Sequence, residues 1–134
     1  MDSRTIALVQ QSWAQVLPIA PQAAALFYNN LFEADPALRS LFRGDLGTQG
    51  NKLMQMLNGA VGNLNSLDSL VPVLEDLAKR HVGYGVAPDD YDTVGAALLK
   101  TLGQGLGDAF TNEVKAAWTT VYQAITGVMV KAAY

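Results

Sequence analysis

The chain contains no cysteine and only one histidine among its 134 residues. Without cysteine it can form no disulfide, no thiolate nucleophile and no cysteine-held iron–sulfur cluster. A structural zinc site uses about four nitrogen or sulfur ligands, so a single histidine excludes that class of site as well. The composition is compatible with a reducing compartment.

Basic residues are also scarce. Nine lysines and arginines stand against 12 acidic residues, which gives a net charge of −3, and the only adjacent basic pair is Lys79-Arg80. This balance argues against a nucleic-acid partner and against an anionic membrane surface. No apolar stretch approaches the roughly 20 residues of a membrane span, and the first residues lack the basic start and apolar block of a secretory signal. We therefore expect a cytoplasmic protein with no membrane partner.

Hydrophobic residues make up half of the chain and recur at intervals of three and four, which is the helical period. No segment shows the sustained alternation of a strand. We expect one domain, residues 1–134, of the all-α class, with six or seven helices. The predicted helices cover 3–17, 21–33, 49–64, about 70–83, 88–106 and the segment that follows Thr111, with a short helical turn over 35–42 and a polar loop over 43–47.

The single histidine, His81, lies on the apolar face of a predicted helix. Leu74 and Leu77 precede it at the spacing of one helical face, and Gly83 and Gly85 follow where that helix should end. One interpretation is a neutral core histidine that hydrogen-bonds a carbonyl group, or a histidine that is partly exposed. The other is an imidazole ligand to a metal or a haem iron, for which one histidine suffices because the porphyrin supplies four nitrogens. This segment alone does not decide between them.

Two further polar side chains, Tyr28 and Gln49, fall on apolar stripes of other predicted helices. A buried phenol or amide costs about 1–3 kcal/mol unless it forms a hydrogen bond. Each could simply bond to a neighbouring carbonyl group. Taken with His81, they also outline a flat apolar slot with an imidazole on one side and two donors on the other, as in a haem pocket.

Other motifs point to no further chemistry. The stretch GQGLG, 103–107, follows a helix and has no lysine behind it, which argues against a phosphate loop. Asp89, Asp90 and Asp92 lack the glycine and glutamate spacing of a calcium loop, and charges at the start of a helix explain them better. No serine or threonine has a histidine near it in sequence, so a hydrolytic triad is not indicated.

Several stretches together resemble the globin family, in particular bacterial single-domain haemoglobins of the Vitreoscilla and flavohaemoglobin-related type. ALFYNNLFEADPALRSLF, from Ala25, looks like the second helix and following corner of those proteins, and QGNKLMQML, from Gln49, looks like their distal helix. LAKRHVGYGV resembles their proximal helix, and DDYDTVGAALL and AAWTTVYQAI resemble their last two helices. The resemblance covers the chain in order. It implies a globin fold of six to eight helices around a pocket for haem b (iron protoporphyrin IX).

The resemblance also implies roles for individual residues. His81 is the expected proximal iron ligand through Nε2, with Nδ1–H donating to a backbone carbonyl near Leu77. Tyr28 and Gln49 are the expected distal donors toward a bound ligand. The other expected contacts are Phe42, Leu53 and Val86 around the haem and the ligand cavity, and Lys52 and Arg80 at the propionates.

Three features depart from the related proteins. Gln49 stands where many globins have a histidine, so a bis-histidine haem is not expected. Tyr91 matches a tyrosine that is linked to the proximal histidine in the flavohaemoglobin-like relatives, but the glutamate of that link falls near Ala133, which has no carboxylate. The flavin and nicotinamide reductase domains are absent from these 134 residues, so we expect any electron supply to come from a separate reductase.

These expectations favour a protein that binds dioxygen reversibly and with high affinity, and that also binds nitric oxide and carbon monoxide. Its role is then oxygen transport, storage or scavenging. One alternative is a nitric oxide dioxygenase, which oxidises nitric oxide to nitrate and relies on a separate reductase. A gas sensor with a protein partner and a haem-free helical interaction module are also open. We expect a monomer or a weak homodimer.

Overall fold

The computed structural model describes residues 2–42 and 44–134, and every regular element in those residues is helical, as predicted. The α-helices of this part of the chain are α1 (Ser3–Val16), α2 (Ala20–Ala34), α3 (Leu46–Gly62), α4 (Val71–Gly83), α5 (Pro88–Leu106) and α6 (Asn112–Ala133). Short 3-10 helices join them: η1 (Leu17–Ile19), η2 (Pro36–Leu41), η3 (Leu64–Leu70) and η4 (Gly107–Ala109).

Capping side chains set where the helices begin. Asp45 accepts a hydrogen bond from the Thr48 N–H at 3.0 Å and caps α3. For this reason α3 begins three residues earlier than the pattern from Gln49 predicts, and the polar loop is shorter than expected. Arg43, the first residue of that predicted loop, lies outside the described residues. Thr111 caps α6 as predicted, accepting from the Val114 N–H at 3.2 Å.

The glycines near the end of α5 do not interrupt the helix. Gly103 and Gly105 are both helical, and α5 ends only where Gly107 takes a φ of +58°. A Cβ atom on Gly103 would lie 3.3 Å from Cδ2 of Phe110. Glycine at this position therefore lets Phe110 pack closely on the helix.

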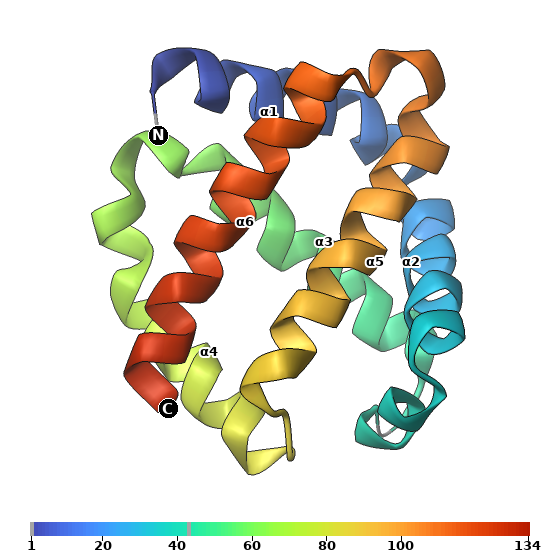
Figure 1. Ribbon diagram of the computed structural model, residues 1–134, viewed down its shortest axis with the longest axis vertical. Helices are drawn as coiled ribbons and strands as arrows, with labels where there is room; N and C mark the ends of the chain where they lie inside the picture. The colour runs from blue at the N-terminus through green and yellow to red at the C-terminus, as the bar shows by residue number, and fades with distance from the viewer. Residues whose placement is uncertain (1, 43) are drawn as a thin grey trace.

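The helices form two crossing layers. In Figure 1, α5 and α6 lie in front of α3, α1 crosses the top, α2 stands at the right and α4 lies at the lower left. α2 packs against α5 and α3, whereas α4 packs chiefly against α6. The connection between α4 and α5 forms the bottom of the molecule in this view.

The hydrophobic core consists of two clusters. The large cluster draws on α1, α2, α3, α5 and α6 and includes Trp13, Phe27 and Trp118. The small cluster has four buried residues from α4, α5 and α6, namely Leu74, Ala78, Tyr91 and Met129. Of the residues expected at the site, Tyr28, Phe42 and Leu53 belong to the large cluster or pack against it. Tyr91 and Val86 do the same in the small cluster.

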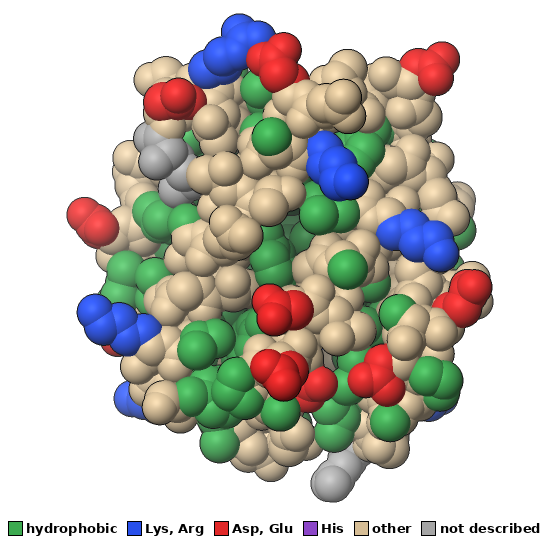
Figure 2. Space-filling view, in the orientation of Figure 1, with side chains coloured by type: hydrophobic (Ala, Val, Ile, Leu, Met, Phe, Trp, Pro, Cys, Tyr) green, Lys and Arg blue, Asp and Glu red, His purple; other side chains and the backbone are tan. Residues whose placement is uncertain are grey.

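The surface carries apolar and acidic side chains together at one end. Figure 2 shows apolar side chains gathered over the lower part of this face, around a group of acidic ones. None of the described helices is long and apolar enough to cross a lipid bilayer.

Candidate functional site

His81 is half-buried in the last turn of α4. Its Nδ1 atom lies 2.8 Å from the carbonyl oxygen of Leu77, one turn earlier, which is the hydrogen bond expected from the sequence. Donation from Nδ1–H to this carbonyl leaves a lone pair on Nε2. Nε2 forms no hydrogen bond with the residues that the structure describes. Arg80, the residue before His81, is exposed, and its Nη2 atom lies 3.4 Å from Oδ2 of Asp76.

Tyr91, on the first turns of α5, packs against His81. The two ring centroids are 6.3 Å apart and the planes are inclined by 24°. The Tyr91 hydroxyl is buried and has no hydrogen-bond partner among the described residues. Burial, together with the nearby Tyr134, raises the pKa of Tyr91 to about 12. The phenol is therefore neutral at physiological pH.

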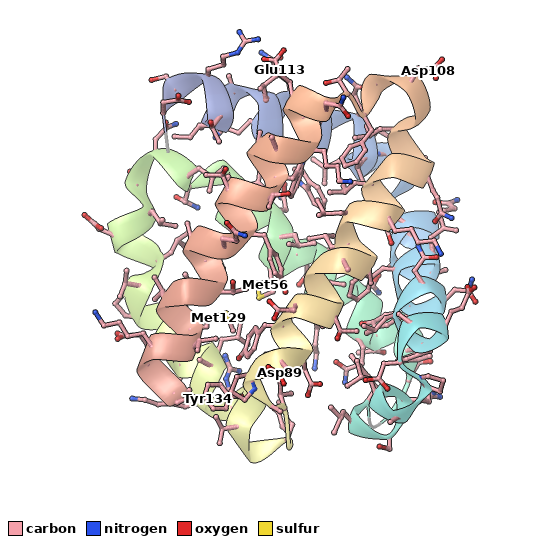
Figure 3. All side chains as sticks on the ribbon, viewed as in Figure 1. Met56, Asp89, Asp108, Glu113, Met129 and Tyr134 are labelled. Carbon is pink, nitrogen blue, oxygen red and sulfur yellow. The ribbon has the colours of Figure 1, made fainter. Side chains whose placement is uncertain are left out.

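Two tyrosines support this side of the site, Tyr122 in α6 and Tyr134 directly after it. Sequence reasoning did not single out either one. The Tyr122 hydroxyl donates to the carbonyl of Tyr91 at 2.6 Å, and the Tyr134 hydroxyl donates to the carbonyl of Val86. Figure 3 places Tyr134 at the end of α6, beside α4. Gly95 is the sequence feature linked to Tyr122 here. A Cβ at this position would lie 2.6 Å from Cε2 of the Tyr122 ring, so the ring packs where a larger residue would not fit.

Tyr28 is buried in α2, and Gln49 lies half-buried on α3. The two helices approach closely at Gly50, where a Cβ would lie 3.0 Å from Cβ of Ala24 and 3.5 Å from Cε2 of Tyr28. Because residue 50 is glycine, the start of α3 can pack directly against α2. Gln49 directly precedes the residue of α3 that lies against Tyr28. Burial raises the pKa of Tyr28, whose hydroxyl forms no hydrogen bond with another described residue.

Phe42 follows η2 and packs on Tyr28. Its ring meets the rings of Tyr28 and Phe32 edge-on, with centroids 5.3 Å and 5.4 Å away. Leu53 is a partly buried member of the large cluster, and Val86 is a partly buried member of the small one. The predicted contact residues therefore divide between two faces. One face consists of residues from α2, α3 and the end of η2, namely Tyr28, Gln49, Leu53 and, directly after η2, Phe42. The other consists of residues from α4, α5 and their connection, namely His81, Val86 and Tyr91.

The two faces meet at one edge. A Cβ on Gly85, which has a φ of +92°, would lie 3.6 Å from Cδ2 of Leu41. The connection after α4 therefore touches the end of η2. Lys52 and Arg80, the predicted propionate residues, are exposed at the surface. The described residues contain no group of three or more histidine, cysteine or acidic side chains that could together hold a metal ion.

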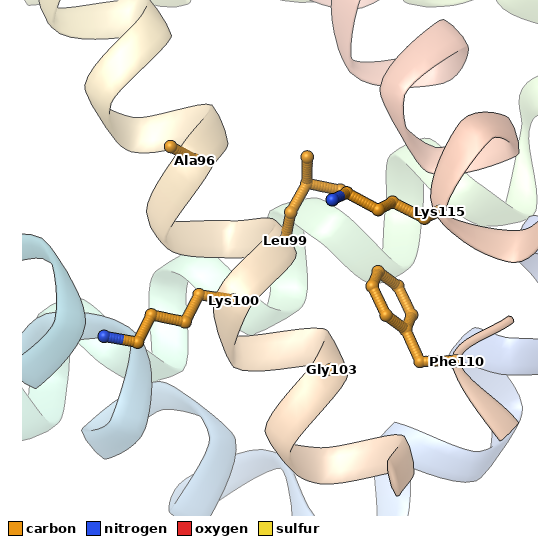
Figure 4. Close-up of a pocket in the computed structure, with 6 residues that line it drawn as sticks. All are labelled: Ala96, Leu99, Lys100, Gly103, Phe110 and Lys115. Carbon is orange, nitrogen blue, oxygen red and sulfur yellow. The ribbon is translucent and has the colours of Figure 1, made fainter. Parts of the chain in front are cut away.

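A separate groove of about 360 Å³ lies between α5 and the start of α6 (Figure 4). It is lined by Ala96, Leu99, Lys100, Gly103, Phe110 and Lys115. None of the predicted site residues lines it.

Comparison with known proteins places the chain in a family. The globin family model matches residues 25–129, so this chain belongs to the globin family. The flavohemoprotein of Rhizobium meliloti (strain 1021) is 33% identical over 106 residues, which cover 77% of this chain and 26% of that protein. The flavohemoprotein of Oceanobacillus iheyensis is 26% identical over 133 residues, which cover 97% of this chain and 33% of that protein. The chain thus spans about a quarter to a third of these relatives.

Globins are haem proteins that bind diatomic gases, and membership implies the same cofactor and class of ligand for this chain. The residues present fit a haem. Three polar atoms at the two faces, His81 Nε2, Tyr28 Oη and Tyr91 Oη, have no hydrogen-bond partner among residues 2–42 and 44–134. One of the three is an imidazole nitrogen with a lone pair, the usual axial ligand of globin haem.

Proposed function

We propose that this protein binds haem b through His81 and uses it to bind dioxygen reversibly and with high affinity. The observation that carries the proposal is the hydrogen bond of 2.8 Å between His81 Nδ1 and the Leu77 carbonyl, because it leaves Nε2 as the ligating nitrogen. When bound, the haem supplies an iron with one open coordination position for a diatomic gas. In this proposal, nitric oxide and carbon monoxide bind at the same site.

On the proximal side, the Leu77 carbonyl fixes both the tautomer and the orientation of the His81 ring. A donor bond from Nδ1–H also raises the basicity of Nε2. Tyr91 packs on the ring at 6.3 Å and presents no charge, since its pKa is raised to about 12. We therefore assign His81 the character of a neutral imidazole ligand.

On the distal side, Tyr28 and Gln49 are the proposed donors to the ligand. Burial raises the pKa of the Tyr28 phenol, which keeps its proton and so its ability to donate. A hydrogen bond to an acceptor that carries charge contributes about 1.5–3 kcal/mol. Dioxygen gains more from these donors than carbon monoxide does, because the bound dioxygen is the more polar ligand.

The remaining assignments follow the two faces. Phe42 holds the haem at the corner after α2, Leu53 shapes the ligand cavity and Val86 packs on the haem edge. Lys52 and Arg80 are exposed and free to turn toward the propionates; the contact of Arg80 with Asp76 is an exposed pair and holds it only weakly. The proposal includes a single domain over 1–134, a cytoplasmic location and a monomer or weak homodimer.

A second candidate function is nitric oxide dioxygenation with electrons from a separate reductase. The names of the relatives favour it, because both matched proteins are flavohemoproteins. The same site serves either function, since each begins with dioxygen held near Tyr28 and Gln49. Nitrate yield from nitric oxide, measured with and without an added flavin reductase, separates the two.

The absorption spectrum tests the proposal directly. The purified protein, or the haem-free protein after addition of haemin, should show a Soret band that shifts on reduction and again under carbon monoxide. His81→Gly should lose the wild-type spectrum and recover it when imidazole is added. A wild-type protein that takes up no haemin, or a His81→Gly protein with an unchanged spectrum without imidazole, would refute the assignment.

A further inference from the structure

Two phenols, one in α6 and one directly after it, bond the connection between α4 and α5 and the first turn of α5. Tyr134 donates to the carbonyl of Val86, and Tyr122 donates to the carbonyl of Tyr91 at 2.6 Å. The two acceptors lie on either side of residues 87–90, where the connection enters α5. The position of this segment is therefore set by α6 and the residue directly after it, which lie far away in sequence.

A continuous path of contacts runs from Tyr134 to the His81 ring. The Val86 carbonyl accepts from Tyr134, the Val86 N–H donates to the His81 carbonyl at 3.1 Å, and His81 Nδ1 bonds the Leu77 carbonyl at 2.8 Å. The covalent bonds of Val86 and His81 link these hydrogen bonds, so the position of Tyr134 bears on the position of the His81 ring.

The rings provide a second path. Tyr134 meets Tyr91 edge-on, with centroids 6.2 Å apart and planes inclined by 83°, and Tyr91 lies against His81 at 6.3 Å. Both paths end on the same imidazole. Backbone hydrogen bonds from Tyr84 and Gly85 back to the last turn of α4 also hold this connection, while the side chain of Tyr84 is exposed.

We propose that Tyr134 is a positioning residue for His81, acting through Val86 and Tyr91. By holding Val86 and Tyr91 in place, it keeps the His81 ring where Nδ1 reaches the Leu77 carbonyl. The proposal rests on the role of His81 as iron ligand under the proposed function, but the hydrogen-bond path itself consists of protein groups alone.

Tyr134→Phe removes the hydroxyl and keeps the ring, so it tests the first path alone. Tyr84→Phe is the matched control, because Tyr84 lies 6.3 Å from the same imidazole and its hydroxyl bonds no residue that the structure describes. His81 is the only histidine, so its ring nitrogens give a single pair of nuclear magnetic resonance signals that need no assignment.

In the haem-free protein, Tyr134→Phe should move the two nitrogen signals of His81 toward the values of mixed tautomers, and Tyr84→Phe should leave them in place. In the haem-bound protein, Tyr134→Phe should speed haemin transfer to apomyoglobin by about two- to tenfold, the range of one hydrogen bond. His81 signals unchanged by Tyr134→Phe, or changed equally by Tyr84→Phe, would overturn the proposal.

The two readouts also separate the proposal from the function on which it rests. Altered His81 signals in a protein that binds no haemin would support the positioning role and refute the haem assignment. Should Tyr134→Phe fail to fold, hydrogen exchange in the wild type decides the matter. The Val86 amide should exchange at least about tenfold more slowly than the amide of a freely exposed loop residue, and equally fast exchange would contradict the path.

Discussion

Replacement of Tyr28 by phenylalanine should raise the rate of dioxygen dissociation while leaving the fold intact. The substitution removes one oxygen atom that has no partner within the described chain. It keeps the ring, whose centroid lies 5.3 Å from that of Phe27, 5.9 Å from that of Phe32 and 5.3 Å from that of Phe42. The free energy of unfolding of the haem-free protein should change by less than about 1 kcal/mol, because no internal hydrogen bond is lost.

The magnitude follows from the strength of the lost donor bond. A hydrogen bond to an acceptor that bears charge contributes about 1.5–3 kcal/mol, and each 1.4 kcal/mol corresponds to about tenfold in a rate or an equilibrium constant. Dioxygen dissociation should therefore accelerate by about 10- to 100-fold. Carbon monoxide dissociation should change much less, since the ligand carries less charge.

The assay is stopped-flow replacement of dioxygen by carbon monoxide, followed in the Soret region, with chemical unfolding of the haem-free protein in parallel. Tyr84→Phe is the control for loss of an exposed phenol. A Tyr28→Phe protein whose dioxygen dissociation stays within about twofold of wild type would refute the donor role, since even a weak hydrogen bond exceeds that change. An equal acceleration for carbon monoxide would point to altered access to the cavity instead.

Three further results are expected. Gln49→Leu should also speed dioxygen dissociation by about tenfold, measured in the same assay, and unchanged dissociation would remove Gln49 from the ligand contacts. Gly95→Ala should destabilise the protein by about 1–3 kcal/mol, because the new Cβ would lie 2.6 Å from the Tyr122 ring, whose hydroxyl is bonded to Tyr91; an unchanged urea midpoint would contradict this packing. Folding raises the pKa of Tyr91 from 10.0 to about 12, so the folded state holds this proton more tightly and stability should fall as pH rises through that interval. Urea unfolding at a series of alkaline pH values measures how steeply the free energy of unfolding falls with pH. The fall should be smaller in Tyr91→Phe than in the wild type, and an equal fall in both proteins would contradict the burial of this phenol.

The sequence was informative where the relevant contact is local. Helical spacing predicted the α-helices, and Gly83 and Gly85 predicted the end of α4, because these depend on residues within about four positions. The globin resemblance implied the bond from His81 to a carbonyl one turn back, which is equally local. The start of α3 was misplaced since the cap at Asp45 outweighs the apolar pattern that begins at Gln49. The family membership expected from the ordered motifs is confirmed.

Contacts between distant residues were not predictable in the same way. Tyr122 reaches Tyr91 across 31 positions and Tyr134 reaches Val86 across 48. Tyr122 lies within the stretch AAWTTVYQAI, but the stretch gives no sign of which residue its hydroxyl bonds. The close approach of α2 and α3 depends on the missing side chain at Gly50, which no periodic pattern reveals. The ligand roles of Tyr28, Gln49 and His81 stay predictions until the spectra and rates are measured.

The division of the core also bears on how haem enters the protein. α4 contributes its buried side chains to the small cluster, which has only four buried residues. Most of the buried side chains of α1, α2, α3, α5 and α6 instead belong to the large cluster. Before the cofactor arrives, α4 should thus be the part that detaches at the lowest free energy. Haem could then be captured from the side by a polypeptide that is otherwise already folded, and its arrival would complete the docking of the helix that carries His81.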